Sequence, residues 1–133
     1  MALSKESRLR RSVDVRRVLA EGKTRVSPLA AFYWLCRGDG AQARVAFIAS
    51  RRVGKAVERN RVRRRLREIM RSELPHVRCP VDMVIVARRE SAAAPFTELK
   101  RQVVGLLARA GLRQQEPGPG SDSAQQGSKG REL

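Results

Sequence analysis

The most regular pattern of hydrophobic and polar positions lies between Val57 and Pro75. Apolar residues recur there at the i, i+4, i+7 and i+8 spacing of one helix face, and a glutamate continues the series at i+11. These positions are Val62, Leu66, Ile69, Met70 and Glu73. The pattern predicts an amphipathic helix that ends before Pro75, because proline does not continue a helix.

Two further helices are predicted on either side of this segment. The first begins at Ser12, a suitable N-cap residue, and ends at Gly22, with three apolar residues at helical spacing between them. The second covers Phe96 to Leu112, and Gly111 suits its C-cap region. The apolar faces of these two helices consist of Val15, Val18 and Leu19 in the first and Leu99, Val103, Leu106 and Leu107 in the second.

Three segments have the composition of strands. The apolar and aromatic run LAAFYWLCR, residues 29–37, is followed by the turn sequence Gly-Asp-Gly and then by RVAFIAS, residues 44–50. Two such runs around a glycine-rich turn predict a hairpin. The third strand, VDMVIVAR at residues 81–88, is apolar enough to be buried on both faces.

The predicted order is therefore α-β-β-α-β-α. It favours an α/β fold of the α+β sandwich type, in which one small central sheet is covered by helices. We expect a single domain at residues 1–113. Residues 114–133 are rich in Gly, Ser and Gln and contain only two apolar residues, so they predict a disordered tail.

The charge balance indicates an anionic partner. The chain of 133 residues carries 29 Lys and Arg against 13 Asp and Glu, a net charge of +16. The tail holds two bases and three acids, which leaves +17 for residues 1–113. No long apolar stretch and no apolar segment behind the basic N-terminus are present, so we expect neither secretion nor membrane association.

Cysteine and histidine are too few for a structural metal cluster. Cys36 and Cys79 lie far apart in sequence and His76 is the only histidine, whereas a zinc site needs about four ligands. We interpret the two thiols as small buried hydrophobic groups in a reducing, cytoplasmic environment, with a disulfide as the less favoured alternative.

The helix that begins after Val57 has a polar face opposite its apolar stripe. Asn60, Arg64, Arg67 and Arg71 fall within roughly 60° of one another, at 100° per residue. Arginines one turn apart, about 5.4 Å, suit the phosphates of a nucleic-acid strand, because each guanidinium can donate two parallel hydrogen bonds. Few acids are available to neutralise them, so phosphate binding is favoured over a merely solvated face. Asn60 either caps the helix or contacts a ligand.

The sequence does not contain a recognisable set of catalytic residues. A hydrolase needs a general base, a nucleophile or a carboxylate cluster, and the carboxylates here are scattered singly. We expect Asp14 to cap a helix and Asp82 to be a polar residue at the end of a strand. Tyr33 and Trp34 point to opposite faces of their strand, so one of them could stack on a base.

The segment RVAFIASRRVGKAVERNRVRRRLREIMR, residues 44–71, resembles the core of the bacterial ribonuclease P protein subunit. In that family a strand ending in Ser and two basic residues leads through Gly to an Arg-Asn-Arg helix. RLRRSVDVRRVLAEG, residues 8–22, and VDMVIVARRESA, residues 81–92, also resemble family segments. The resemblance covers about Arg8 to Leu112 and implies a left-handed strand-helix-strand crossover, whereas general topology rules favour the right-handed one.

The resemblance implies that an RNA subunit, with bound Mg2+, removes the 5′ leader of precursor tRNA. The protein would assist this endonuclease without catalytic residues, metal or cofactor of its own. Implied contacts with the RNA subunit are Ser50, Arg51, Arg52, Lys55, Arg59, Asn60, Arg61, Arg63, Arg64, Arg67 and Arg71. A cleft for the leader is implied at Val15, Leu19, Tyr33 and Arg88.

The sequence departs from the family pattern in this cleft. Val15 and Leu19 occupy positions that are commonly Phe, and Ala46 stands where Gly is usual. Stacking on an aromatic ring is worth about 1–3 kcal/mol per base, so leader contact should depend more on Tyr33 and on charge. Two other hypotheses remain open, namely a basic structural RNA-binding protein of the small ribosomal type and a non-specific DNA-binding protein.

Overall fold

The computed structural model describes residues 7–37, 42–77 and 79–113. The predicted tail and the Gly-Asp-Gly turn lie outside the described residues. The elements follow one another as α1 (Ser12–Glu21), β1 (Lys23–Val26), β2 (Ala30–Cys36), β3 (Arg44–Ile48), α2 (Ala56–Glu73), β4 (Val81–Ala87) and α3 (Phe96–Arg109), with short 3-10 helices at Leu74–His76 and Arg89–Ala92. The predicted mixed α/β class, with one small sheet covered by helices, is confirmed.

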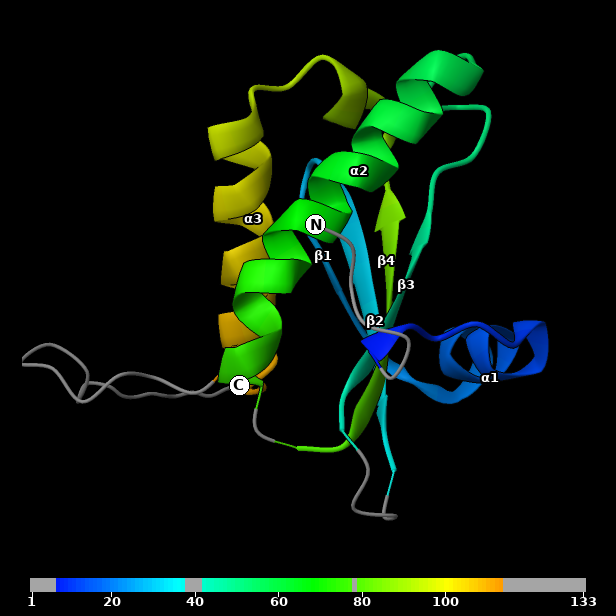
Figure 1. Cartoon of the computed structure of the whole chain (residues 1–133), viewed down its shortest axis with the longest axis vertical. Coiled ribbons are helices and arrows are strands. Elements are labelled where there is room, and N and C mark those ends of the chain that lie inside the picture. The colour runs from blue at the N-terminus through cyan, green and yellow to red at the C-terminus, as the bar shows by residue number, and fades with distance from the viewer. Residues whose placement is uncertain (1–6, 38–41, 78, 114–133) are drawn as a thin grey trace, which may run out of the picture.

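The four strands form one sheet in the order β1-β2-β4-β3 (Figure 1). The predicted hairpin between β2 and β3 is wrong, because β4 lies between them. β2 pairs antiparallel with β4 from Ala30↔Ala87 to Cys36↔Val81, and β3 pairs parallel with β4 from Arg44↔Asp82 to Ile48↔Val86. β4 is the strand that is apolar on both faces, and a central position buries both.

Strand β1 was not predicted. All four of its residues, Lys-Thr-Arg-Val, are exposed, and it forms one edge of the sheet by pairing antiparallel with β2. A short polar strand lacks the alternation of apolar and polar residues by which strands are predicted. For this reason β1 is missing from the predicted order of elements. Lysine and arginine on an edge strand also discourage pairing with another chain.

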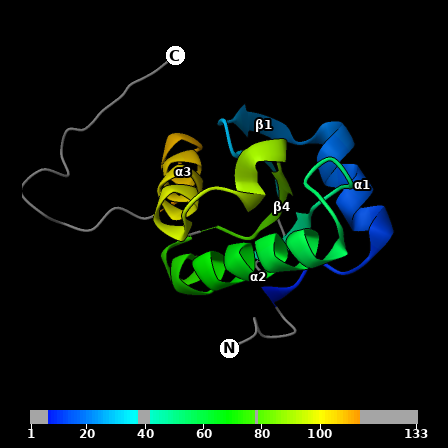
Figure 2. The same cartoon turned by 90° about the horizontal axis from the view of Figure 1, so that it is seen from above.

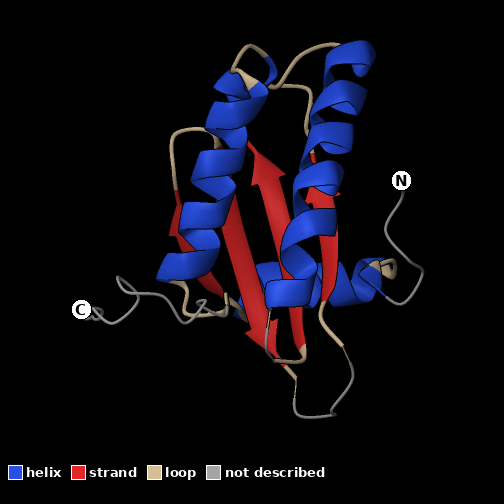
Figure 3. Ribbon diagram, turned by 60° about the vertical axis from the view of Figure 1, so that its left-hand side comes forward, coloured by secondary structure: helices blue, strands red, loops and turns tan. Residues whose placement is uncertain are grey.

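The crossover from β3 through α2 to β4 is left-handed. In Figures 1 and 3, α2 lies in front of the sheet, the two parallel strands point upward, and β4 lies to the left of β3. About 98% of such crossovers are right-handed, so general topology rules predict the opposite hand. The family resemblance implied the hand that the structure has.

Helices cover the sheet on both faces. Helices α2 and α3 lie side by side on one face, and α1 crosses the other (Figure 2). The apolar stripe predicted for α2 is confirmed, since Val62, Leu66, Ile69, Met70 and Glu73 are all buried. The predicted α3 face, Leu99, Val103, Leu106 and Leu107, is buried as well. The larger of the two apolar cores lies between these helices and the sheet, and it contains Phe32, Met83 and Ile85.

The N-terminal boundary of α1 differs from the prediction. Arg11 occupies the N-cap position and Ser12 is the first helical residue, so the predicted Ser12 cap is wrong. The helix ends before Gly22, as predicted. A Cβ atom at Gly22 would lie 2.5 Å from the carbonyl oxygen of Val18 and 2.6 Å from that of Trp34, closer than real contacts allow. This close approach requires glycine where α1 turns into β1.

Asp82 is a buried ion-pair centre and not a simple strand-end residue. Its residue surface is only 6% exposed, and both of its carboxylate oxygens accept hydrogen bonds from Arg44, each at 2.9 Å. The guanidinium of Arg37 also contacts this carboxylate. Arg44 approaches Asp14 of α1 to 4.0 Å, so Asp14 takes part in the same charge network at the edge of the sheet.

The two cysteines are free, and neither is fully buried. Cys36 is exposed and Cys79 is partly buried, so the prediction that both are buried is wrong. Burial raises the pKa of the Cys79 thiol, and the neighbouring Cys36 thiol raises it further.

Candidate nucleic-acid interface

The outer face of α2 is a row of cations on a fixed support. Because the stripe opposite is buried, the helix cannot rotate, and the predicted polar residues project away from the sheet. Asn60, Arg63, Arg64 and Arg67 line a shallow surface hollow of about 460 Å3, together with Val57, which is 74% exposed. The structure therefore brings together three of the residues that the sequence assigned to one face, Asn60, Arg64 and Arg67, and places Arg63 beside them.

The arginines of α2 divide into two groups by their partners. Two arginines donate hydrogen bonds to backbone carbonyls: Arg59 to that of Gly54 at 3.0 Å and Arg65 to that of Ala94 at 2.9 Å. Two others have side-chain partners: Arg63 donates to Asn60 at 2.5 Å, and Arg71 pairs with Glu68 at 2.5 Å. Arg61, Arg64 and Arg67 have no side-chain hydrogen bond or ion pair within the described part of the chain. These three cations are the ones left available for phosphate.

The ion pair at the end of α2 affects Arg71. Its hydrogen bond with Glu68 raises the pKa of Arg71 and lowers the pKa of Glu68, so both groups stay charged. Arg71 is therefore partly neutralised, which makes it a less favoured candidate for phosphate binding than Arg64. Asn60 lies beyond the first turn of α2 and accepts the hydrogen bond from Arg63, so it does not cap the helix.

The turn between β3 and α2 presents the remaining basic residues predicted at the strand end. The Val53 amide donates to the carbonyl of Ser50 at 3.0 Å, and the Gly54 amide to that of Arg51 at 3.2 Å. Gly54 has φ +149°, and a Cβ there would lie 2.7 Å from the Glu58 carboxylate, so this position requires glycine. The side chains of Arg51, Arg52 and Lys55 are exposed around this turn.

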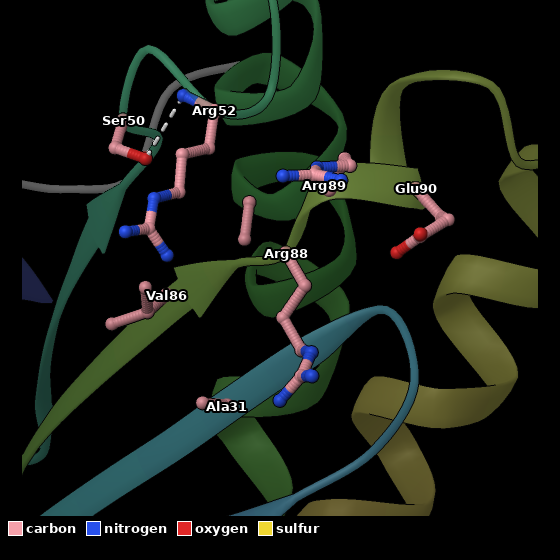
Figure 4. Close-up of a pocket in the computed structure, with 8 residues that line it drawn as sticks. Ala31, Ser50, Arg52, Val86, Arg88, Arg89 and Glu90 are labelled. Carbon is pink, nitrogen blue, oxygen red and sulfur yellow. Dashed lines mark hydrogen bonds between the residues drawn. The ribbon is translucent and has the colours of Figure 1, made fainter.

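A pocket of about 570 Å3 lies beside this turn, at the carboxyl ends of β3 and β4 (Figure 4). Arg52 reaches it from the turn, and Arg88, Arg89 and Glu90 reach it from the segment after β4. The remaining lining residues are Ser50, Ala31, Val86 and Ala87. The carboxyl ends of neighbouring parallel strands meet at one edge of a sheet, which is a common place for ligands.

This pocket joins the two groups of residues that the resemblance implied. Ser50 and Arg52 belong to the implied RNA-subunit contacts, and Arg88 belongs to the implied leader cleft. Sequence reasoning missed Arg89 and Glu90. They belong to a polar segment after a strand, where only their position next to Arg88 could have indicated a role.

The face of the sheet under α1 carries the remaining residues of the implied cleft. Val15 and Tyr33 pack around buried Val18 and Val84, whereas Leu19 is 36% exposed and lies outside this cluster. Trp34 points to the opposite face, where its ring stacks on Phe32 with centroids 5.3 Å apart, so Tyr33 is the aromatic residue on the α1 side. Val86 belongs to both this cluster and the pocket, which makes the two regions contiguous.

Within residues 7–37, 42–77 and 79–113, three or more His, Cys, Asp or Glu side chains do not gather where they could hold a metal ion. In the same residues, none of the helices combines the length and the apolar character needed to span a membrane.

Comparisons with known proteins agree on one family. The Ribonuclease P family model matches residues 3–111. The chain is 40% identical over 114 residues to a ribonuclease P protein component of Symbiobacterium thermophilum, covering 86% of this chain and 99% of the relative. It is 44% identical over 110 residues to that of Chloroflexus aurantiacus, covering 79% of this chain and 78% of the relative.

Solved structures show the same fold. The Thermotoga maritima RNase P protein aligns with a TM-score of 0.69 and 25% identity, over 77% of this chain and 96% of that one. The Staphylococcus aureus RNase P protein aligns with a TM-score of 0.75 and 19% identity, over 81% and 98% of the two chains. With a family model over most of its length and relatives at 40% identity or more, this chain belongs to the ribonuclease P protein family.

Proposed function

We propose that this protein binds the catalytic RNA of ribonuclease P and the 5′ leader of precursor tRNA. The observation that carries the proposal is the unpaired row Arg61, Arg64 and Arg67 on a helix whose opposite face is fixed in the core. This row suits the backbone of a folded RNA, because the helix that carries it is already fixed and only the arginine side chains have to be ordered on binding.

The electrostatic role follows from the charges of the partners. The catalytic RNA and precursor tRNA are both polyanions. Residues 1–113 of this protein carry a net charge of +17, which lowers the repulsion between the two RNAs. In this proposal the RNA subunit performs phosphodiester hydrolysis and holds Mg2+, as the family resemblance implies. The protein positions the substrate, and its place of action is the bacterial cytoplasm, where precursor tRNA is processed.

The leader is proposed to follow the α1 side of the sheet towards the basic pocket. Tyr33 lies half-buried on this face, and Val86 connects its cluster to Arg52 and Arg88. A strand of RNA there would meet first an aromatic ring for stacking and then cations for its phosphates.

Reconstitution at low magnesium tests the proposal. The protein is added to its cognate catalytic RNA, and 5′ cleavage of precursor tRNA is followed over time. We expect stimulation of cleavage by the protein and no cleavage by the protein without RNA. Absence of stimulation, or cleavage by the protein alone, would contradict the proposal.

Tyr33→Ala tests the leader path within the same complex. Loss of one stacked base should weaken binding of precursor tRNA with a long leader by about 1–3 kcal/mol and leave mature tRNA binding unchanged. Binding of the two RNAs to the reconstituted complex is measured by titration. Phe at this position should restore most of the loss, because it keeps the ring. Equal losses for both RNAs would argue against leader contact at Tyr33.

A further inference from the structure

Glu90 is an acid in a pocket that otherwise carries only positive charge. Arg52, Arg88 and Arg89 line the same cavity of about 570 Å3. In Figure 4, Arg52 lies on one side of the end of β4 and Glu90 on the other, with Arg88 and Arg89 between them. Within the described residues, Glu90 has no side-chain hydrogen bond or ion pair with any of these arginines. The carboxylate and the three guanidinium groups are therefore all available to a ligand.

The mixture of charges favours a ligand larger than phosphate alone. A pocket for an isolated phosphate gains nothing from a carboxylate, which repels the anion and accepts hydrogen bonds only. A ligand that pairs with both the arginines and the carboxylate carries negative charge at one end and hydrogen-bond donors at the other. The cavity also has an apolar part, formed by Ala31, Val86 and Ala87, against which a flat group can lie.

A nucleotide unit has these properties. Its phosphates suit Arg52 and Arg88, its base has apolar faces, and the edge of most bases carries N–H donors. The volume lies within the range of small-ligand sites, about 300–1,000 Å3. Single-stranded RNA is read in this way, by stacking and by hydrogen bonds to the exposed base edges.

We propose that this pocket seats one nucleotide of the leader and that the Glu90 carboxylate reads its base. This inference rests on the proposed function, which brings the leader to the pocket. The two carboxylate oxygens accept in parallel from the N1–H and amino group of guanine, whereas adenine and cytosine offer the amino group alone. Uracil offers the N3–H alone, and this donor is flanked by two carbonyl oxygens that the carboxylate repels. The expected order at one leader position is guanine first, adenine and cytosine next, and uracil last.

The experiment measures precursor tRNA binding to the reconstituted complex with each leader position changed in turn to all four bases. We expect one position at which guanine binds about fivefold to tenfold more tightly than uracil, in line with a bidentate base contact at an open site. Glu90→Ala should abolish this preference. Glu90→Gln, which keeps the shape but presents one donor and one acceptor, should lower the preference for guanine.

A matched control separates base reading from charge. Glu98→Gln removes one negative charge on α3, outside the pocket, and should change the affinity for all four bases by the same factor. Glu90 is exposed, so its variants should unfold at the temperature of the unsubstituted protein, which circular dichroism checks.

Two outcomes would overturn the inference: no position with a base preference in the unsubstituted complex, or a preference that Glu90→Ala leaves intact. Both leave the proposed function in place, provided that precursor tRNA still binds more tightly than mature tRNA. If the unsubstituted complex does not distinguish precursor from mature tRNA, the proposed function itself is contradicted.

Discussion

Asp82→Ala is expected to lower the free energy of unfolding by about 3 kcal/mol, because it leaves two arginines without their buried partner. The side chains of Arg37 and Arg44 are only 13% and 30% exposed, so water replaces the lost carboxylate poorly. Removing one member of a buried ion pair costs about 3–5 kcal/mol, and the partial exposure of Arg44 places this case at the low end. Urea unfolding, followed by circular dichroism, measures the change.

Glu98→Ala is the matched control for this prediction. Glu98 also pairs with arginine, since Arg101 first and Gln102 second hold the pKa of its carboxyl group at about 2. That pair lies in solvent on α3, with side chains 71% and 38% exposed, so its loss should change stability much less. Equal losses for the two variants would contradict the view that Asp82 is a buried centre.

The Asp82 network also affects how α1 lies on the sheet. Arg44 reaches from β3 to both Asp82 of β4 and Asp14 of α1, and it joins the helix to the strands through charge as well as through Val18. Loss of Asp82 should therefore make local unfolding of α1 easier than that of α2 and α3 on the other face of the sheet. Amide exchange should rise first in α1, where few apolar contacts compensate.

Long amphipathic elements could be predicted from the sequence. The buried positions of α2 and α3 were identified residue by residue, since eighteen and fourteen residues at helical period give a strong signal. Strand β4 was identified because a run that is apolar apart from Asp82 has few alternatives. In each case the information lies within one continuous segment of the chain.

Pairing between distant segments could not be predicted in this way. The hairpin of β2 with β3 followed from their proximity in sequence, but both strands pair with β4, which lies more than thirty residues beyond β3. Strand β1 depends wholly on its partner β2. The burial of Asp82 has the same origin, because Arg44 belongs to β3 and Arg37 directly follows β2.

The candidate site shows the same division. The sequence identified the row on α2 and the residues Ser50, Arg52 and Arg88, but not that these three meet in one pocket. That meeting follows from the parallel pairing of β3 with β4, which places both carboxyl ends at one edge. Glu90 became a candidate only when the structure placed it among three arginines.

Arg64→Ala combined with Arg67→Ala is expected to weaken binding of the catalytic RNA and to reduce its salt dependence. Each phosphate contact contributes about 0.7 to 0.9 to the slope of log affinity against log salt, so two lost contacts should lower the slope by about one to two. Neither side chain has an internal partner in the described residues, so stability should change little. Affinity is measured by titration at several salt concentrations.

Lys100→Ala with Arg109→Ala removes the same charge from α3 and is the control for this double variant. If the α2 row binds phosphate, the control should lower affinity slightly through long-range attraction and leave the slope nearly unchanged. Arg65→Ala adds a second comparison, because Arg65 holds the carbonyl of Ala94 and should affect stability more than the slope. An unchanged slope for the Arg64 and Arg67 variant would mean that this face is only solvated, since contact with phosphate requires release of counterions.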